Sequence, residues 1–221
     1  MLFAAACASS PPSRFYTLTS LPESERQSAD IKGGELAIGI GPVVFPQFLD
    51  RPQLVVRDSA NRLDLKEFNR WGGTVQDDFL RVWGENLAFL LDTSRLVIFP
   101  SESRMPLDFR VTAEVINFEG QADAEAVLKV RWSVMDERLR QSMASQIDVY
   151  RCPVQAEVDS GSDSDAAQGV SVGGNADSRL SAARSEAIVA AMSRCLGQFS
   201  RDVAAVISTL PKPASETTTG L

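Results

Sequence analysis

Residues 107–135 read LDFRVTAEVINFEGQADAEAVLKVRWSVM, and this stretch decides the fold. In its first half, Phe109, Val111, Ala113 and Val115 alternate with polar residues, which is the two-residue period of a half-buried strand. Its second half alternates in the same way and contains Leu128, Val130 and Trp132. The polar residues 119–123 between the halves are typical of a turn. The stretch therefore predicts two long paired strands, over residues 107–118 and 124–135.

Further strands are expected on both sides of this pair. The segments with β-branched and aromatic residues are 14–20, 35–45, 95–99 and 146–151, with a bend or bulge at Gly41-Pro42 in the second. Residues 54–57 and 62–65 flank the turn residues 58–61, which predicts a hairpin.

Two helices are expected. Thr74 is suited to cap a helix over residues 74–91, and acidic residues follow in its first turn. Its apolar stripe consists of Val75, Phe79, Val82, Trp83, Asn86, Leu87 and Leu90. A second helix is expected over residues 179–208, with a stripe of Ile188, Met192, Cys195, Phe199, Val203 and Val206. Both stripes indicate helices that pack on a sheet.

The order strands, helix, strands, helix predicts a single α/β (α+β) domain, with a mixed, mostly antiparallel sheet covered by two long helices. The expected domain covers residues 14–210. Residues 156–178 are Asp, Ser, Gly and Ala with few apolar residues, so a flexible loop is expected there. Residues 211–221 are expected to form a disordered tail.

Composition excludes several function classes. The chain has no histidine and a net charge of -7, and its 22 Lys and Arg residues form no cluster. Nucleic-acid binding is therefore not expected. Without histidine the commonest general base and metal ligand are missing, so the sequence predicts no catalytic residues, no metal and no cofactor.

Three short motifs do not change this expectation. Gly169-Val170-Ser171-Val172-Gly173 matches a nucleophile elbow, but its serine has no histidine to take its proton. Gly39-Ile40-Gly41 lacks the rest of a dinucleotide loop. Asp159, Asp163 and Asp165 lack the spacing of a calcium loop, and a solvated acidic segment is the simpler interpretation.

The N-terminus, Met1-Leu2-Phe3-Ala4-Ala5-Ala6-Cys7, resembles the lipobox of bacterial lipoproteins, in which a signal peptide is cut before an acylated cysteine. Residues 1–7 are therefore expected to be a signal-peptide remnant with its lipobox, and Ser- and Pro-containing residues 8–13 a tether. The resemblance implies a lipid group such as palmitate on Cys7. Ala8 after the cysteine implies sorting to the outer membrane of a Gram-negative bacterium, on its periplasmic face. The alternative is that Cys7 is an ordinary terminal cysteine.

Cys152 and Cys195 leave two possibilities open. Cysteines in the oxidising periplasm often pair, and a disulfide between these two would close a long loop. Cys195 also lies on an apolar stripe, where an unpaired thiol packs as a small hydrophobic group.

Several segments together resemble the ABC-type transport auxiliary lipoproteins, the family of the Pqi-operon lipoprotein. They are Phe15-Tyr16-Thr17-Leu18, Gly39 to Pro46, Phe48 to Arg57, Arg70-Trp71, and Glu85-Asn86-Leu87-Ala88; within them, Leu49-Asp50-Arg51-Pro52-Gln53 is the most specific element. The resemblance implies an accessory lipoprotein that works by protein–protein contact. Its implied partners are an ABC transporter and a mammalian-cell-entry (MCE) protein, which move lipids or other hydrophobic compounds between the two membranes. It also implies a possible ring of identical subunits.

Arg51, Arg57 and Trp71 are the candidate partner contacts. For each there is a structural alternative: Asp50 and Arg51 can form a local salt bridge, and a tryptophan at a helix entry commonly packs in the core. Two other functions are weighed against the accessory role. A periplasmic lipid-binding chaperone would need a deep apolar cavity. A histidine-free hydrolase would need two carboxylates converging in a cleft.

Overall fold

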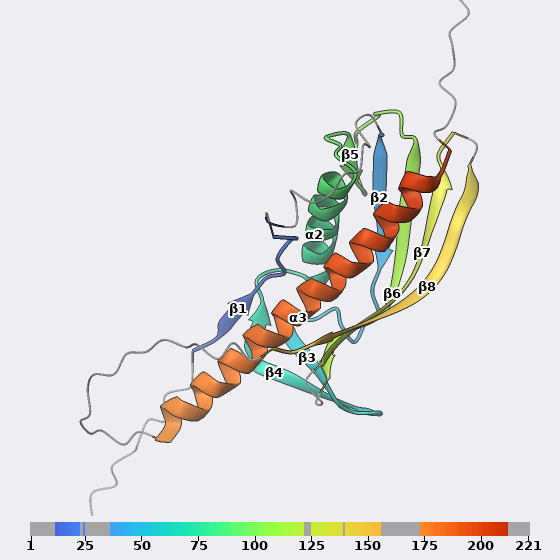
Figure 1. The fold of residues 1–221 in the computed structure, drawn as a ribbon. Coiled ribbons are helices and arrows are strands. Elements are labelled where there is room, and N and C mark those ends of the chain that lie inside the picture. Colours follow the sequence, from blue (N-terminus) through green and yellow to red (C-terminus); the bar gives the residue numbers. More distant parts are fainter. Residues whose placement is uncertain are drawn as a thin grey trace, which may run out of the picture.

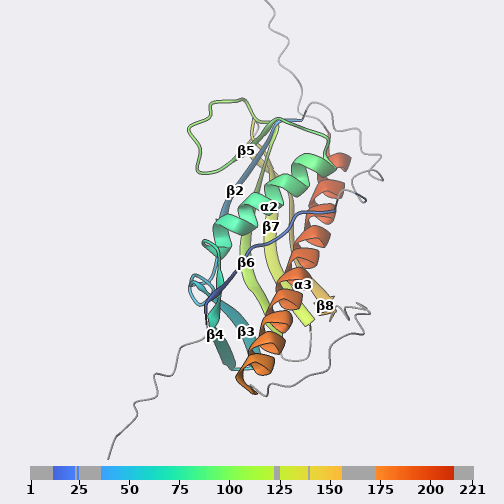
Figure 2. The ribbon, with the colours of Figure 1, turned by 90° about the vertical axis from the view of Figure 1, so that its left-hand side faces the viewer.

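The computed structural model describes residues 12–22, 24, 36–121, 125–138, 140–155 and 173–211. Eight strands form a single mixed sheet, and two helices lie side by side across one of its faces (Figures 1 and 2). The strands are β1 (Arg14–Tyr16), β2 (Ile38–Val44), β3 (Gln53–Ser59), β4 (Arg62–Trp71), β5 (Leu96–Ile98), β6 (Phe109–Gln121), β7 (Glu125–Asp136) and β8 (Gln141–Pro153). The helices are α2 (Val75–Leu90) and α3 (Gly173–Thr209). The single α/β domain is therefore confirmed.

The predicted pair of long strands is the centre of the sheet. β6 and β7 pair antiparallel from Phe109 and Asp136 to Gly120 and Ala126, and β8 continues the ladder at the edge. The other side of β6 pairs with two strands, β2 along its first half and β3 near its end. The sheet then extends through β3 to β4 and β1 in one direction, and through β2 to β5 in the other.

The expectation of a mostly antiparallel sheet needs correction. Four of the seven strand pairings are parallel: β1 with β4, β2 with β5, β2 with β6, and β3 with β6. The antiparallel ladders are longer, but they join strands that are neighbours in sequence. A parallel pairing joins segments far apart in the chain and leaves no turn signal between them, so the sequence pattern did not reveal it.

Helix α2 is close to the prediction. The side chain of Thr74 accepts a hydrogen bond from the backbone N–H of Asp77, which caps the helix. Every residue of the predicted stripe is buried. Aromatic rings connect the helix to the rest of the core, because Phe79 packs edge-on against Phe118 of β6 and Trp83 stacks on Phe199 of α3.

Helix α3 begins earlier than predicted, at Gly173. The expected flexible loop was therefore wrong for residues 173–178, while residues 156–172 lie outside the described residues. The Gly and Ser content of this segment favours a loop by composition. Ser185, Ser193 and Ser200 further along the helix return their hydroxyls to the carbonyl one turn back, as helical serines do.

Other strand boundaries also differ. β8 starts at Gln141, five residues before the predicted start, and β1 ends at Tyr16 where a strand to residue 20 was expected. β2 continues through Gly41-Pro42, where Gly41 has a φ of 103° and the register against β6 shifts between Ile40 and Val43. That backbone conformation favours glycine, and the bend expected there is present. Neither described helix has the length and apolar character needed to cross a bilayer.

Candidate partner-binding site beside the N-terminal strap

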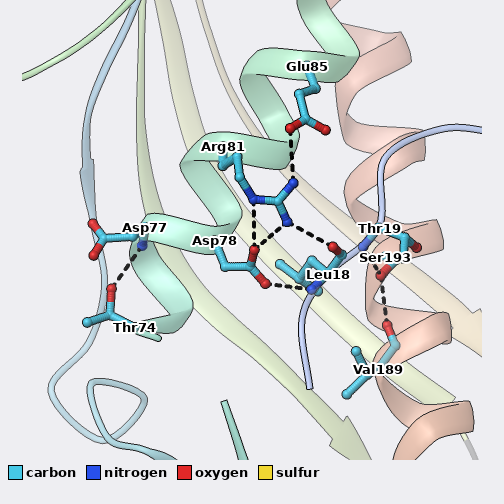
Figure 3. Close-up of polar contacts among 9 residues, drawn as sticks. All are labelled: Leu18, Thr19, Thr74, Asp77, Asp78, Arg81, Glu85, Val189 and Ser193. Atoms are coloured by element: carbon cyan, nitrogen blue, oxygen red, sulfur yellow. Dashed lines mark hydrogen bonds and ion pairs between the residues drawn. The ribbon is translucent and has the colours of Figure 1, made fainter. Parts of the chain in front are cut away.

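Residues 17–21, which we call the strap, follow β1 and lie between the two helices (Figure 3). The strap is extended but pairs with no strand in the described chain. Its apolar side chains, Leu18 and Leu21, are 2% and 7% exposed and belong to the core. An extended segment with a buried side needs donors and acceptors for its peptide groups, and the helices provide them as side chains.

Helix α2 binds the strap at Leu18. The backbone N–H of Leu18 donates to Asp78 Oδ2 at 2.5 Å, and its carbonyl accepts from Arg81 Nη2 at 3.0 Å. Arg81 also pairs with Asp78 at 2.5 Å and with Glu85 at 3.0 Å. The hydrogen bond that Arg81 donates to the Asp78 carboxylate raises the pKa of Arg81 above its ordinary value, so the guanidinium stays charged. Asp78 and Arg81 thus bind both backbone polar groups of Leu18, and Glu85 pairs with Arg81 one turn further along the helix.

Helix α3 and the end of α2 bind the rest of the strap. The N–H of Thr19 donates to Ser193 Oγ at 3.1 Å, and the Ser193 hydroxyl donates in turn to the Val189 carbonyl (Figure 3). The N–H of Leu21 donates to Asn86 Oδ1 at 2.8 Å, and Asn86 Nδ2 donates to Ser200 Oγ at 3.2 Å. These two hydrogen bonds explain why a polar residue, Asn86, lies within the apolar stripe of α2.

A groove of about 530 Å³ runs between β1, the strap and α3. It is lined by Arg14, Phe15, Tyr16, Thr17, Thr19, Ala182, Glu186, Val189, Ala190 and Ser193. The Tyr16 hydroxyl at its base donates to Asn69 Oδ1 at 3.0 Å, and burial raises the pKa of this phenol. The lining mixes short apolar side chains with hydroxyls and opposite charges. Such a lining can contact a peptide through apolar groups, hydroxyls and charges.

The three predicted contact residues lie in different environments. Arg51 follows the turn after β2 and is half-buried; its Nε has no hydrogen-bond partner among the described residues. Arg57 of β3 pairs with the buried Glu119 at 2.7 Å and lies over the Phe48 ring. Trp71 is the last residue of β4 and only 5% exposed. For Trp71 the structure supports the core alternative, although the tryptophan ends a strand rather than entering a helix.

The structure brings the two later cysteines together. Cys152 of β8 and Cys195 of α3 are joined by a disulfide with a Cα–Cα distance of 5.7 Å. Both residues are buried, so the bond lies inside the core between the edge strand and the helix. Cys7 lies outside the described residues, as do Asp159, Asp163, Asp165 and Ser171.

The buried carboxylates of the described chain have structural partners. Glu119 accepts from Arg57, Asn117 Nδ2 and the N–H of Phe118, and Asp108 accepts from Arg138 and the N–H of Ala37. Neither carboxylate lines the groove. Within the described ranges, no group of three or more Cys, Asp or Glu side chains is placed to hold a metal ion.

Sequence reasoning missed most of the residues that build this site. Asp78, Arg81 and Glu85 have the spacing of helical ion pairs, which was a usable signal. Ser193 gave no signal, and Tyr16 lay in a segment of the resemblance that did not reveal its contacts, because the partners of these residues are 174 and 53 residues away in the chain.

Comparison with solved structures supports the fold. Protein XCC0632 from Xanthomonas campestris is 13% identical, with a TM-score of 0.58 over 90% of this chain and 93% of that one. The crystal structure of an uncharacterized protein is 15% identical, with a TM-score of 0.57 over 89% of this chain and 99% of the other. At these identities the likeness shows a shared fold.

Sequence comparison identifies the family. No curated protein sequence matches the chain. The model of the ABC-type transport auxiliary lipoprotein component matches residues 16–204, which include the last residue of β1, the strap, strands β2 to β8, helix α2 and most of α3. The chain therefore belongs to the family of ABC-type transport auxiliary lipoproteins.

Proposed function

We propose that this protein is a lipid-anchored accessory component of an ABC and MCE-type transport system, on the periplasmic face of the outer membrane. It acts by protein–protein contact and not by catalysis. The family match over residues 16–204 carries the proposal. The geometry supports it, because the groove and its surroundings present a surface suited to a peptide.

The proposed anchor is an acyl group on Cys7. Only six residues separate Cys7 from Arg14, the first residue of β1. The chain then passes through β1 into the strap, whose peptide groups are held by both helices. A lipid group at Cys7 would thus connect to the core through a short tether and a fixed segment.

Arg51 is the strongest of the proposed partner contacts. Its Nε is buried without a hydrogen-bond partner in the described chain, and a buried donor of this kind is costly until an acceptor arrives. A carboxylate or carbonyl of the partner would supply that acceptor. Arg57 and Trp71 then stabilise the strands near Arg51 indirectly, Arg57 by its ion pair with Glu119 and Trp71 by packing in the core.

A lipid-binding chaperone is the second candidate, and the groove is the observation that bears on it. Ligand sites for apolar molecules are mainly apolar and enclose most of the ligand. This groove is open and is lined by Arg14, Glu186, Thr19 and Ser193 as well as apolar side chains. We therefore favour a peptide of a partner protein as its occupant.

Co-purification from the native membrane tests the proposal. The full chain should carry an acyl mass on Cys7 and should retain an MCE-type protein encoded beside it.

Arg51→Glu should weaken that retention by roughly tenfold, as a lost charge-assisted hydrogen bond predicts. Arg62→Glu is the matched control, because Arg62 is an exposed arginine paired only with Asp58 among the ion pairs of the described residues. Retention that is equal for both variants would reject Arg51 as a contact, and failure of every co-encoded component to bind would reject the function. The same purification shows, by its mass, whether identical subunits form a ring.

A further inference from the structure

Two exposed aromatic side chains lie together at the edge of the sheet where the chain enters the fold. Phe15 of β1 is 67% exposed and Phe68 of β4 is 43% exposed. The parallel register places Phe15 opposite Arg70, and Phe68 precedes Arg70 by two residues. The register of β4 against β3 shifts between Lys66 and Arg70, so burial decides the face here: Asn69 and Trp71 are buried, and Phe68 and Arg70 lie on the other face together with Phe15. We call them the aromatic edge.

Phe68 and Arg70 lie on the face away from the helices, and Phe15, which also borders the groove, is mostly exposed beside them. The neighbouring residues Tyr16, Asn69 and Trp71 point to the opposite face, where Asn69 and Trp71 are buried and the Tyr16 hydroxyl reaches the Ala182 carbonyl of α3. β1 is the outermost strand of the sheet on this side (Figure 1). Burial in the core therefore does not account for the two phenylalanines.

The length of the tether indicates what covers them. From Cys7 to Phe15 the chain spans at most roughly 25 Å even when fully extended. An acyl group on Cys7 would keep the aromatic edge this close to the bilayer, whereas β8 forms the opposite edge of the sheet. Tethering at this distance creates a high local concentration of membrane, so that a contact too weak to bind a detached domain becomes populated.

We propose that the aromatic edge, Phe15 and Phe68 with Arg70, rests in the interfacial region of the bilayer that holds the anchor. Aromatic rings bury apolar area at the boundary between headgroups and acyl chains, and a neighbouring arginine reaches the phosphates. The inference rests on the proposed anchor at Cys7. It adds an orientation: the β1 edge faces the membrane and β8 points away from it.

Brominated vesicles test this orientation without depending on natural acylation. Cys152 and Cys195 are joined in a disulfide, which leaves Cys7 as the one cysteine of the sequence for maleimide coupling. The full unacylated chain is coupled through Cys7 to a maleimide lipid in phosphatidylcholine vesicles, with or without dibromo-phosphatidylcholine. Phe15→Trp and Phe68→Trp introduce the probes, and Ile147→Trp on β8, a site 54% exposed, is the matched control.

Brominated lipid should quench about half of the emission added by Phe15→Trp or Phe68→Trp, because bromine quenches indoles that lie in the interface. The Ile147→Trp emission should not change, and the uncoupled chain should show no quenching. Equal quenching at all three sites, or none at position 15, would overturn the inference. If the Phe15→Trp emission changes with protein concentration but not with brominated lipid, a second copy of the chain covers this edge. That result would also overturn the inference. Mass spectrometry that finds Cys7 unmodified in the native protein would reject the anchor by an independent route.

Discussion

Arg57, a predicted contact for a partner protein, pairs in the structure with a buried carboxylate and stabilises the fold. Its partner, Glu119, is 0% exposed, and the carboxylate accepts from Arg57 Nε at 2.7 Å, Asn117 Nδ2 at 2.9 Å and the N–H of Phe118 at 2.9 Å. A buried carboxylate with three donors is satisfied, and Arg57 is its one cationic donor among the described residues, so removing Arg57 leaves the charge uncompensated. Arg57 therefore holds the end of β6 against β3.

Arg57→Met is expected to lower the free energy of unfolding by about 2–3 kcal/mol, since the methionine keeps much of the packing and leaves Glu119 without its cation. Urea denaturation of the full chain measures this value. Arg62→Met is the control, because its exposed pair with Asp58 should contribute less than about 0.5 kcal/mol. Equal losses in the two variants would show that Glu119 does not depend on Arg57.

Among the elements, the strap resembles an edge strand, but its backbone hydrogen bonds go to side chains of the two helices instead of to a neighbouring strand. Asp78, Asn86 and Ser193 accept its N–H groups, and Leu18 and Leu21 fill the space between α2 and α3. The N-terminal segment is thus part of the core. A change in the strap should therefore be felt by both helices.

Asp78→Ala should destabilise the protein by about 1–3 kcal/mol, because the N–H of Leu18 loses its acceptor in a part-buried position. The amide of Leu18 should then exchange with deuterium roughly tenfold faster or more, as local opening becomes easier. Hydrogen exchange followed at the strap measures this change. Glu85→Ala removes an exposed partner of Arg81 that does not touch the strap, and it should leave the exchange rate almost unaltered. An unchanged exchange rate of the Leu18 amide in Asp78→Ala would contradict the proposed role of these side-chain hydrogen bonds.

At the scale of the whole molecule, the sheet is long and open on one face, and α3 crosses it from the β1 side toward the β8 side (Figure 1). The disulfide joins the edge strand to this helix across a separation of 43 residues. Cross-linking of this span restricts the unfolded chain much more than the folded one.

The double variant Cys152→Ala/Cys195→Ala is expected to lose about 4 kcal/mol, the chain-entropy value for a loop of this length. For a domain of this size, the melting temperature should fall by roughly 10 °C. Calorimetry of the full chain measures both quantities, and the single variant Cys7→Ala serves as the control because it leaves the disulfide intact. A melting temperature equal to that of the unaltered chain would mean that the cross-link contributes nothing.

The elements with local signals can be predicted from the amino-acid sequence alone. The β6–β7 hairpin follows from alternation around a polar turn, and α2 follows from its cap and from a stripe that includes Trp83 and Leu87. The lipoprotein family also followed from short segments, and the family match confirms it. These features depend on residues that are near one another in the chain.

The parallel pairings, the strap and the environments of the candidate contacts could not be predicted, because they depend on how distant segments pack. Tyr16 meets Asn69, Thr19 meets Ser193, and Phe15 lies beside Arg70 because strands and helices far apart in sequence are packed together. Glu119 lies in a segment whose composition is typical of a turn, and only the extension of β6 buries it. Composition and periodicity report whether a segment tends to be helical, extended or exposed; which partner it meets is fixed by the packing of the whole chain around one core.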